Sequence, residues 1–248
     1  ACAENNKPLL ILDRPNPMNG LYVDGNIAKE TGSFVCYYEI PYCHGMTVGE
    51  LARYVNTEFQ INCNLLVIPM QGWKRDMSWD ETGLAWVPTS PHIPEPVSVF
   101  YYNVTGIIGE LHTVCEGVGY TLPFQLIGAE WIDATAFADK MNSFNLPGVR
   151  FMPFYFKPYY TANKDKALKG VKIALSDPES AQPLRIGFYL IYALQTMYPQ
   201  QFDLAAMQKA GNQRMSMYRK VLGGQELVDM TIQKTEPEKI FATWEAGL

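Results

Sequence analysis

The stretch GMTVGELARYVNTEFQINCNLLVIPM, residues 45–70, decides the fold class because it places a helix directly before a strand. Thr47 is followed three residues later by Glu50, the pattern of a helix capping box, and apolar residues then recur at helical spacing. We therefore predict a helix over about residues 48–59. The apolar run NLLVIPM, which closes the stretch, is typical of a buried strand that ends in a polar loop.

A second strand is expected upstream, in the stretch KPLLILDRPNPMNG, residues 7–20. Leu9–Leu12 fit a buried strand, and the polar, proline-stiffened segment after them fits its exit loop. The order strand, loop, helix, strand favours an α/β sheet. In such sheets the loops after the carboxyl ends of the strands bind ligands, so these polar loops are where a ligand site is expected.

The remaining sequence predicts further strands and helices. Residues 124–129 fit a strand, and a helix capped by Asp133 follows it. The stretches GVRFMPFYFKPYY and GVKIALSD predict two strands of one hairpin or sheet, and PLRIGFYLIYALQTMYP predicts a helix. From Phe202 onward the composition is helical, with a break at Gly223–Gly224. The proline-rich segment 80–96 predicts little regular structure.

A change of pattern near residue 146, at NLPG, predicts a domain boundary. With 248 residues the chain can form one large domain or two unequal ones. We expect an α/β domain over residues 1–146 and a smaller α+β domain over residues 147–248.

The composition argues against several classes of protein. A net charge of −5, without a long block of Lys and Arg, gives no support for nucleic-acid binding. No apolar run is long enough for a transmembrane helix. The five cysteines show no CxxC spacing, and the three histidines lie far apart, so no metal site and no disulfide framework is predicted. Glycine-rich cofactor loops are also missing, and we predict no cofactor.

Two carboxylates are the best candidates for chemistry. Glu110 and Glu116 lie in GELHTVCEGVGYTLPFQLIGAEW, residues 109–131, on a connection whose glycines would let backbone approach a ligand. Glycoside hydrolysis typically needs two such groups, one protonated and one ionised. An ordinary turn is the alternative, with Glu110 ending a strand in solvent and Glu116 stabilising the turn. We expect Cys115 to be a semi-buried thiol in a loop rather than a nucleophile.

Polar residues follow two of the predicted strands and fit a sugar-binding site. The segment DRPNP comes directly after the first strand, and GWKRDM, residues 72–77, contains an indole beside two cations. That combination suits a sugar ring that carries a carboxylate, through stacking and ion pairing. A rigid exit turn and a solvated charged loop remain the alternatives. The residues concerned are Asp13, Arg14, Asn16, Trp73, Lys74 and Arg75.

Six separated motifs occur together in the order and spacing of one family. They are LDRPNPMNG, HGMTVGELA, MQGWKRDM, TGLAWVPTSPHIP, EGVGYTLPFQLIGAEWI and GVRFMPFYFKP. In these motifs the chain resembles the exo-β-N-acetylmuramidases of the NamZ type, long known only as a bacterial domain of unknown function. The resemblance runs from about Pro8 to the C-terminus.

The resemblance implies a Rossmann-like three-layer α/β domain, then a smaller α+β domain that closes an active cleft. Residues 1–146 would be the C-terminal portion of the first domain. Members of the family release N-acetylmuramic acid from the non-reducing end of peptidoglycan fragments, which implies a location outside the cytoplasm. The site residues implied are Glu110 and Glu116 for catalysis, and Asp13, Arg14, Asn16, His44, Trp73, Lys74, Arg75, Trp86 and His112 for substrate binding.

The sequence also departs from the family pattern. Members usually carry further strands and acidic residues before LDRPNP, so we expect this chain to be part of a longer protein with a further acid upstream. Thr113 and Val118 stand where the family loop usually has asparagine and arginine, and His92 where asparagine is common. The loss of a polar donor and a cation favours an alternative function, that of a glycan-binding relative without turnover. Oligomeric state is not indicated.

Overall fold

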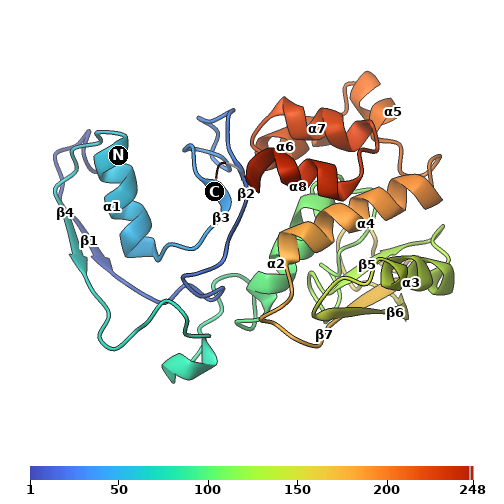
Figure 1. Cartoon of the computed structure of the whole chain (residues 1–248), viewed down its shortest axis with the longest axis horizontal. Coiled ribbons are helices and arrows are strands. Elements are labelled where there is room, and N and C mark those ends of the chain that lie inside the picture. The colour runs from blue at the N-terminus through green and yellow to red at the C-terminus, as the bar shows by residue number, and fades with distance from the viewer. Residues whose placement is uncertain (246, 248) are drawn as a thin grey trace. The chain divides into compact units, whose positions relative to one another are not determined.

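The helix predicted from the capping box is present as α1 (Val48–Glu58) in the computed structural model, which describes residues 1–245 and 247 (Figure 1). The side chain of Thr47 accepts a hydrogen bond from the Glu50 backbone N–H at 3.2 Å. In return the Thr47 N–H donates to the Glu50 carboxylate at 3.0 Å. Both bonds satisfy N–H groups that have no partner within the helix, so this cap fixes where α1 begins.

Both strands predicted around α1 form and pair in parallel, as an α/β arrangement requires. β1 (Leu9–Leu12) lies beside β4 (Leu65–Ile68), with Leu9 opposite Leu65 and Leu12 opposite Ile68. The prediction that these strands are buried is wrong for one face. Val67 packs under α1 and is buried, but Leu10, Leu12, Leu66 and Ile68 are exposed, because no described residue covers the opposite face.

Two short strands were not predicted. β2 (Val23–Ile27) and β3 (Pro41–His44) pair with each other. Neither contains an apolar run or a clean alternation of apolar and polar residues, which are the patterns that identify strands. Between β4 and residue 97 the regular structure consists of one short 3₁₀ turn, η1 (Asp80–Thr82). This agrees with the prediction that the proline-rich segment 80–96 has little regular structure.

A three-stranded antiparallel sheet organises the second half of the chain. Its order is β5 (Leu126–Ala129), β7 (Leu168–Leu175), β6 (Val149–Phe156), so the predicted strand pair β6–β7 is confirmed. α3 (Ala134–Ser143) packs on this sheet and is capped by Asp133, whose carboxylate accepts from Ala136 N–H at 3.0 Å. Figure 1 shows α3 against the strands.

Long apolar helices supply the core of this half. The predicted helix is α4 (Pro183–Met197), and it packs against α2 (Ser98–Gly109), which was not predicted. Val104, Ile108 and Leu194 are fully buried where these helices contribute to the core. The C-terminal helices are α5 (Leu204–Lys209), α6 (Gln213–Val221), α7 (Gln225–Ile232) and α8 (Pro237–Glu245).

The chain divides into two compact units that are discontinuous in sequence. The first holds residues 1–24 and 43–87, and the second holds residues 25–42 and 88–248. The mixed α/β class is therefore confirmed as a two-unit arrangement. The boundary predicted near residue 146 falls inside the second unit, between α3 and β6, and stays a prediction.

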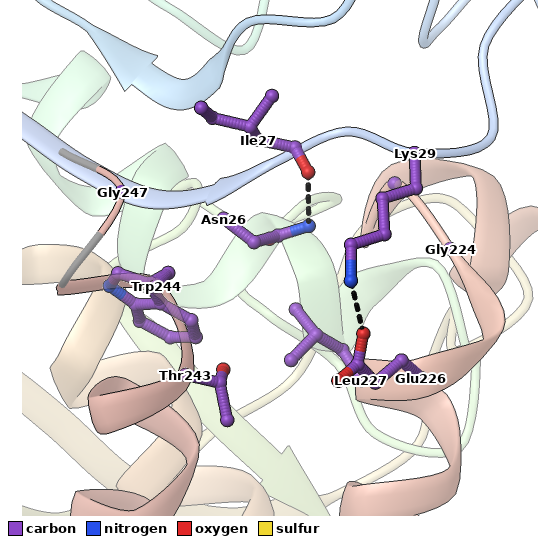
Figure 2. A pocket seen from close by; sticks show the side chains of 10 residues that line it. Asn26, Ile27, Lys29, Gly224, Glu226, Leu227, Thr243, Trp244 and Gly247 are labelled. Carbon is purple, nitrogen blue, oxygen red and sulfur yellow. Dashed lines mark hydrogen bonds and ion pairs between the residues drawn. The ribbon is translucent and has the colours of Figure 1, made fainter.

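Residues 25–30 are fastened to the turn between α6 and α7. The backbone N–H groups of Lys29 and Glu30 donate to the Gly223 carbonyl at 2.8 and 3.0 Å. Lys29 also forms an ion pair with Glu226 at 2.6 Å, on the wall of a small cavity of about 140 Å³ (Figure 2). Gly223 has a φ of +75°, and a side chain there would press on Ala28, which explains the predicted helix break.

No helix within residues 1–245 is both long and apolar enough to cross a membrane.

Candidate active site

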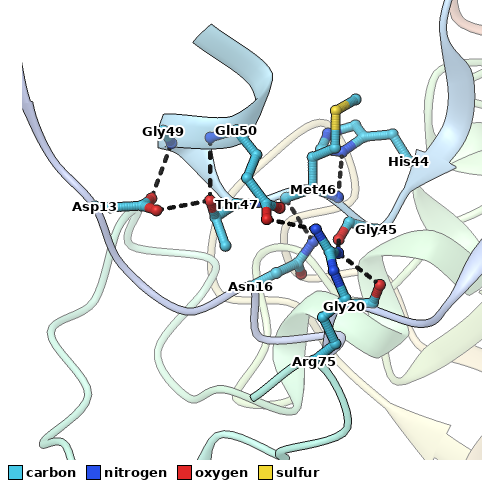
Figure 3. Close-up of polar contacts among 10 residues, drawn as sticks. All are labelled: Asp13, Asn16, Gly20, His44, Gly45, Met46, Thr47, Gly49, Glu50 and Arg75. Atoms are coloured by element: carbon cyan, nitrogen blue, oxygen red, sulfur yellow. Dashed lines mark hydrogen bonds and ion pairs between the residues drawn. The ribbon is translucent and has the colours of Figure 1, made fainter. Parts of the chain in front are cut away.

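In the first unit the Asp13 carboxylate is bound at the start of α1. One oxygen accepts from the Thr47 hydroxyl at 2.9 Å, and the other accepts from the Gly49 N–H at 2.9 Å (Figure 3). A negative group is favourable there because the first helical N–H groups carry partial positive charge. Gly49 has to be small, since a Cβ would lie 2.7 Å from the Asp13 Cγ. The helix therefore fixes the position of this carboxylate.

Asn16 and His44 join the same cluster through the backbone of Met46. The Asn16 amide donates to the Met46 carbonyl at 3.0 Å, and the Met46 N–H donates to His44 Nδ1 at 3.1 Å. Burial lowers the pKa of His44, which favours the neutral ring. Because Nδ1 accepts, the neutral ring carries its proton on Nε2 and can donate a hydrogen bond from that atom.

Arg75 links three loops of this unit. Its guanidinium donates to the carbonyls of Gly20 at 3.0 Å and Gly45 at 3.3 Å, and it forms an ion pair with Glu50 (Figure 3). Glu50 was predicted only as a helix-capping residue, so its second role as the partner of Arg75 is new. The ion pair is partly exposed to solvent. Because the guanidinium already donates to Gly20, Gly45 and Glu50, several of the donors that a substrate carboxylate would need are in use.

Trp73 lies beside Arg75, and its indole is mostly enclosed. The guanidinium carbon is 5.9 Å from the ring centroid. The buried indole N–H has no hydrogen-bond partner within residues 1–245 and 247, and Trp73 lines a cavity of about 280 Å³ with Pro15 and Met77. A buried donor without an acceptor is costly, and a ligand oxygen would satisfy it.

Three further predicted residues of this unit do not join the cluster shown in Figure 3. Arg14 and Lys74 are exposed, so their charges face solvent. Trp86 packs edge-to-face against Trp79, with ring centroids 4.8 Å apart. The structure therefore gathers Asp13, Asn16, His44, Trp73 and Arg75 into one connected group.

In the second unit Glu110 follows directly after α2, so the alternative in which it ends a strand is wrong. Its side chain lines a cavity of about 380 Å³, within the range of roughly 300–1,000 Å³ that is usual for ligand pockets. Aromatic side chains form much of the wall, and Asn103 adds an amide. The rings are those of Phe34, Tyr37, Tyr38, Tyr42 and Tyr102.

Glu116 differs from Glu110 in its surroundings. It packs against Gly109, where an added Cβ would lie 3.1 Å from the carboxyl carbon. Burial raises the pKa of Glu116 from its ordinary value, a hydrogen bond from its own backbone N–H partly opposes this, and the charge of Glu110 raises the pKa further. A raised pKa extends the pH range over which the Glu116 carboxyl keeps its proton, while the neighbouring Glu110 supplies negative charge. This is the division of roles that glycoside hydrolysis requires.

His112 lies between these two glutamates in sequence but is exposed, and its φ of +54° is left-handed. Desolvation lowers the pKa of His112, and the charge of Arg214 lowers it further, while Glu110 opposes both. The second unit thus places Glu110 within electrostatic reach of both Glu116 and His112. Arg214 was not predicted as a site residue, because it lies on α6, about 100 residues after His112 in the sequence.

The loop that follows Glu116 depends on two glycines. Gly117 and Gly119 have φ values of +91° and +96°, and a Cβ on either would overlap a backbone carbonyl. Cys115 is buried and pairs through its backbone with Gly128. Burial raises its pKa to about 11, which agrees with an unreactive thiol. The hydroxyl of Thr113 is buried and has no partner among the described residues.

The aromatic wall of the Glu110 cavity was not predicted from the sequence. The signal that could have found it is the run FVCYYEIPY, residues 34–42, which is dense in tyrosine but has no helical or strand period. Within residues 1–245 and 247 no three His, Cys, Asp or Glu side chains lie together in a way that could hold a metal ion.

Known proteins are similar to this chain over most of its length. Two family models match, described as exo-beta-N-acetylmuramidase NamZ, N-terminal, over residues 1–97, and C-terminal, over residues 100–248. A curated relative from Bacillus subtilis, peptidoglycan beta-N-acetylmuramidase NamZ, is 40% identical over 204 residues. That alignment covers 82% of this chain and 49% of the relative, so the chain spans about half the length of the curated protein.

Two crystal structures of DUF1343 family proteins from Bacteroides fragilis are also similar. One has a TM-score of 0.91 and 41% identity, and the other has a TM-score of 0.65 and 25% identity. Each match covers 99% of this chain and 64% of the other.

Proposed function

Because this chain belongs to the exo-beta-N-acetylmuramidase NamZ family, we propose that its protein is a glycoside hydrolase that releases N-acetylmuramic acid from the non-reducing end of peptidoglycan fragments. The observation that carries the proposal is the pair Glu110 and Glu116, in which burial raises the pKa of one carboxyl and the other raises it further. The beta-N-acetylmuramidase activity named for the Bacillus subtilis relative supports it.

In the proposed reaction the Glu116 carboxyl donates its proton to the oxygen that joins the muramic acid to the next sugar. The bond from that oxygen to the anomeric carbon breaks, and the bonding electrons leave with the oxygen. The Glu110 carboxylate stabilises the positive charge that develops at the anomeric carbon. Water then forms the new bond to this carbon and loses a proton, which restores the Glu116 carboxyl.

Substrate recognition is proposed for the group gathered in the first unit. The Trp73 indole N–H needs an acceptor, and the sugar offers hydroxyl and acetamido oxygens. We assign the lactyl carboxylate of muramic acid to the cations Arg14, Lys74 and Arg75, all three of which are exposed. His44, as a neutral ring, would donate from Nε2.

We place the reaction outside the cytoplasm, where peptidoglycan lies, and propose a part in cell-wall recycling. Fractionation of cells that express the full-length protein tests the location. Recovery of the protein in the cytoplasmic fraction alone would contradict it.

The test of function is a chromogenic glycoside of N-acetylmuramic acid, used with the full-length protein beside a binding titration with the free sugar. Glu110→Gln and Glu116→Gln should lose turnover and keep binding, while Glu58→Gln, which changes an exposed carboxylate on α1, should keep both. Binding without turnover in the parent protein would instead identify a glycan-binding relative. Full turnover in both glutamine variants would remove these carboxylates from the reaction.

A further inference from the structure

The connection between β6 and β7 carries a tyrosine-lined groove that none of the assigned site residues enters. The groove encloses about 750 Å³ and is lined by Tyr120, Tyr155, Tyr159 and the lysines Lys157 and Lys169. Its floor includes Phe156 and Leu168, which are buried in a small core cluster. Tyrosine rings with exposed faces above an apolar floor are suited to binding the apolar faces of sugar rings.

Two rings of the groove are accessible, and that of Tyr159 is also held in place. Tyr155 and Tyr159 each expose 64% of their surface. Tyr159 stacks on Tyr120, with centroids 5.8 Å apart and planes 14° from parallel, and Tyr120 packs in turn on Phe156. The Tyr159 N–H donates to the Gly119 carbonyl at 2.7 Å, so the groove is fixed to the glycine loop. Little side-chain entropy would therefore be lost at Tyr159 when a ligand binds.

The charge around the groove is opposite to that of the protein as a whole. Residues 155–172 contain five lysines and one acid, Asp165, whereas the protein has a net charge of −5. Asp165 forms a long ion pair with Lys157, at 3.8 Å, and both side chains are exposed. The lysines of this segment outnumber its single acid five to one, so the local field is positive. An anionic ligand would be attracted to it.

We propose that this groove binds a carboxylate-bearing sugar of the peptidoglycan strand at a place separate from the bond that is cleaved. Tyr155 and Tyr159 would stack on the sugar, and Lys157 and Lys169 would pair with the lactyl or peptide carboxylates. The groove would hold the protein on the polymer while chain ends are processed. This inference rests on the proposed function for the identity of the polymer, but its binding step needs no turnover.

The test is co-sedimentation of the full-length protein with purified, insoluble peptidoglycan, alongside turnover of the soluble chromogenic muramic-acid glycoside. Removal of both rings in Tyr155→Ala/Tyr159→Ala should weaken sedimentation roughly tenfold, the effect of two aromatic contacts. Turnover of the small glycoside should stay at the parent level. The variant Tyr155→Phe/Tyr159→Phe keeps the rings and should retain most of the binding.

Charge is tested separately with Lys157→Gln/Lys169→Gln. This variant should lose the salt-sensitive part of the binding, and it should no longer distinguish native peptidoglycan from peptidoglycan whose carboxylates have been amidated. Lys209→Gln, an exposed lysine on α5, is the matched control and should bind like the parent.

Several results would overturn the inference. They are unchanged sedimentation of the double alanine variant, an equal loss of binding and small-substrate turnover, and binding that depends on a protein contaminant or on self-association rather than on the polymer. A parent protein that sediments with peptidoglycan but turns over no glycoside would refute the proposed function and leave the groove assignment standing.

Discussion

The carboxyl group of Glu116 lies against the Cα of Gly109, close enough that a methyl group at residue 109 would come within 3.1 Å of its carboxyl carbon and 3.4 Å of one oxygen. The last residue of α2 therefore sets where the proposed acid sits. Tight contacts of this kind displace a neighbour by a few tenths of an ångström, and catalysis is sensitive to such displacements.

Gly109→Ala should therefore lower turnover while the fold is kept. We expect a loss of roughly tenfold in kcat, because the carboxyl has to move. Alanine is favoured over glycine in a helix by about 1 kcal/mol, so the melting temperature should stay the same or rise. Steady-state kinetics and thermal unfolding of one preparation measure both quantities. Unchanged kcat would show that the Glu116 position is not critical.

The raised pKa of Glu116 should appear in the pH dependence of stability. Burial holds the proton on the folded protein above the ordinary value of 4.5, so the parent loses stability as pH rises from that value through the raised pKa. Glu116→Gln cannot lose a proton, and it should match the parent at low pH and become relatively more stable toward neutral pH. Denaturant unfolding across pH checks this, with the exposed Glu58→Gln as control. A difference that does not vary with pH would contradict it.

The roles of Arg75 can be separated by a pair of variants. Arg75→Ala removes the guanidinium together with its bonds to Gly20 and Gly45. Glu50→Gln removes the negative partner but keeps an amide oxygen that can accept the capping bond from the Thr47 N–H. If Arg75 also binds the lactyl carboxylate, Arg75→Ala should weaken binding of N-acetylmuramic acid more than that of N-acetylglucosamine. Glu50→Gln should keep or strengthen the preference for muramic acid. Calorimetric titrations with both sugars measure this, and equal losses for the two sugars would assign Arg75 a purely structural role.

Gly117 and Gly32 allow backbone strain and steric overlap to be distinguished. Their φ values are +91° and +90°, but a Cβ at Gly117 would overlap the Leu122 carbonyl, whereas a Cβ at Gly32 would meet nothing within 4 Å. Gly32→Ala should cost about 1–2 kcal/mol, the penalty of the left-handed region. Gly117→Ala should cost about 1–3 kcal/mol more, because backbone has to move. Chemical denaturation compares them, and equal costs would refute the close approach.

Elements with local signals could be predicted from the sequence. α1 could be found because its capping box lies within four consecutive residues, and α3 because Asp133 precedes its first turn. α2 lacks such a signal: Val97 makes no side-chain cap, and the helix is apolar on most sides because it is buried among other elements. An apolar run of that kind does not distinguish a helix from a strand.

The candidate site shows the same limit. The sequence places Asp13 in a loop after a strand, but its bond to Gly49 joins residues that are 36 positions apart. The Glu110 cavity combines residues 34–42 with α2 and with residues 221–223. Only folding brings these segments together, so the carboxylates could be proposed from the sequence while their aromatic surroundings could not.

The fastening of residues 25–30 to the turn at Gly223 has a consequence for how the protein can be divided and assembled. A gene cut between the two family models, near residue 98, would give a C-terminal fragment that lacks residues 25–30, which bind Gly223, and lacks Tyr37, Tyr38 and Tyr42 of the Glu110 cavity. The same contacts join residues almost 200 positions apart, and contacts of such long range are slow to form. During synthesis on the ribosome, the cavity beside Lys29 and Glu226 can form only after α6 and α7 have emerged.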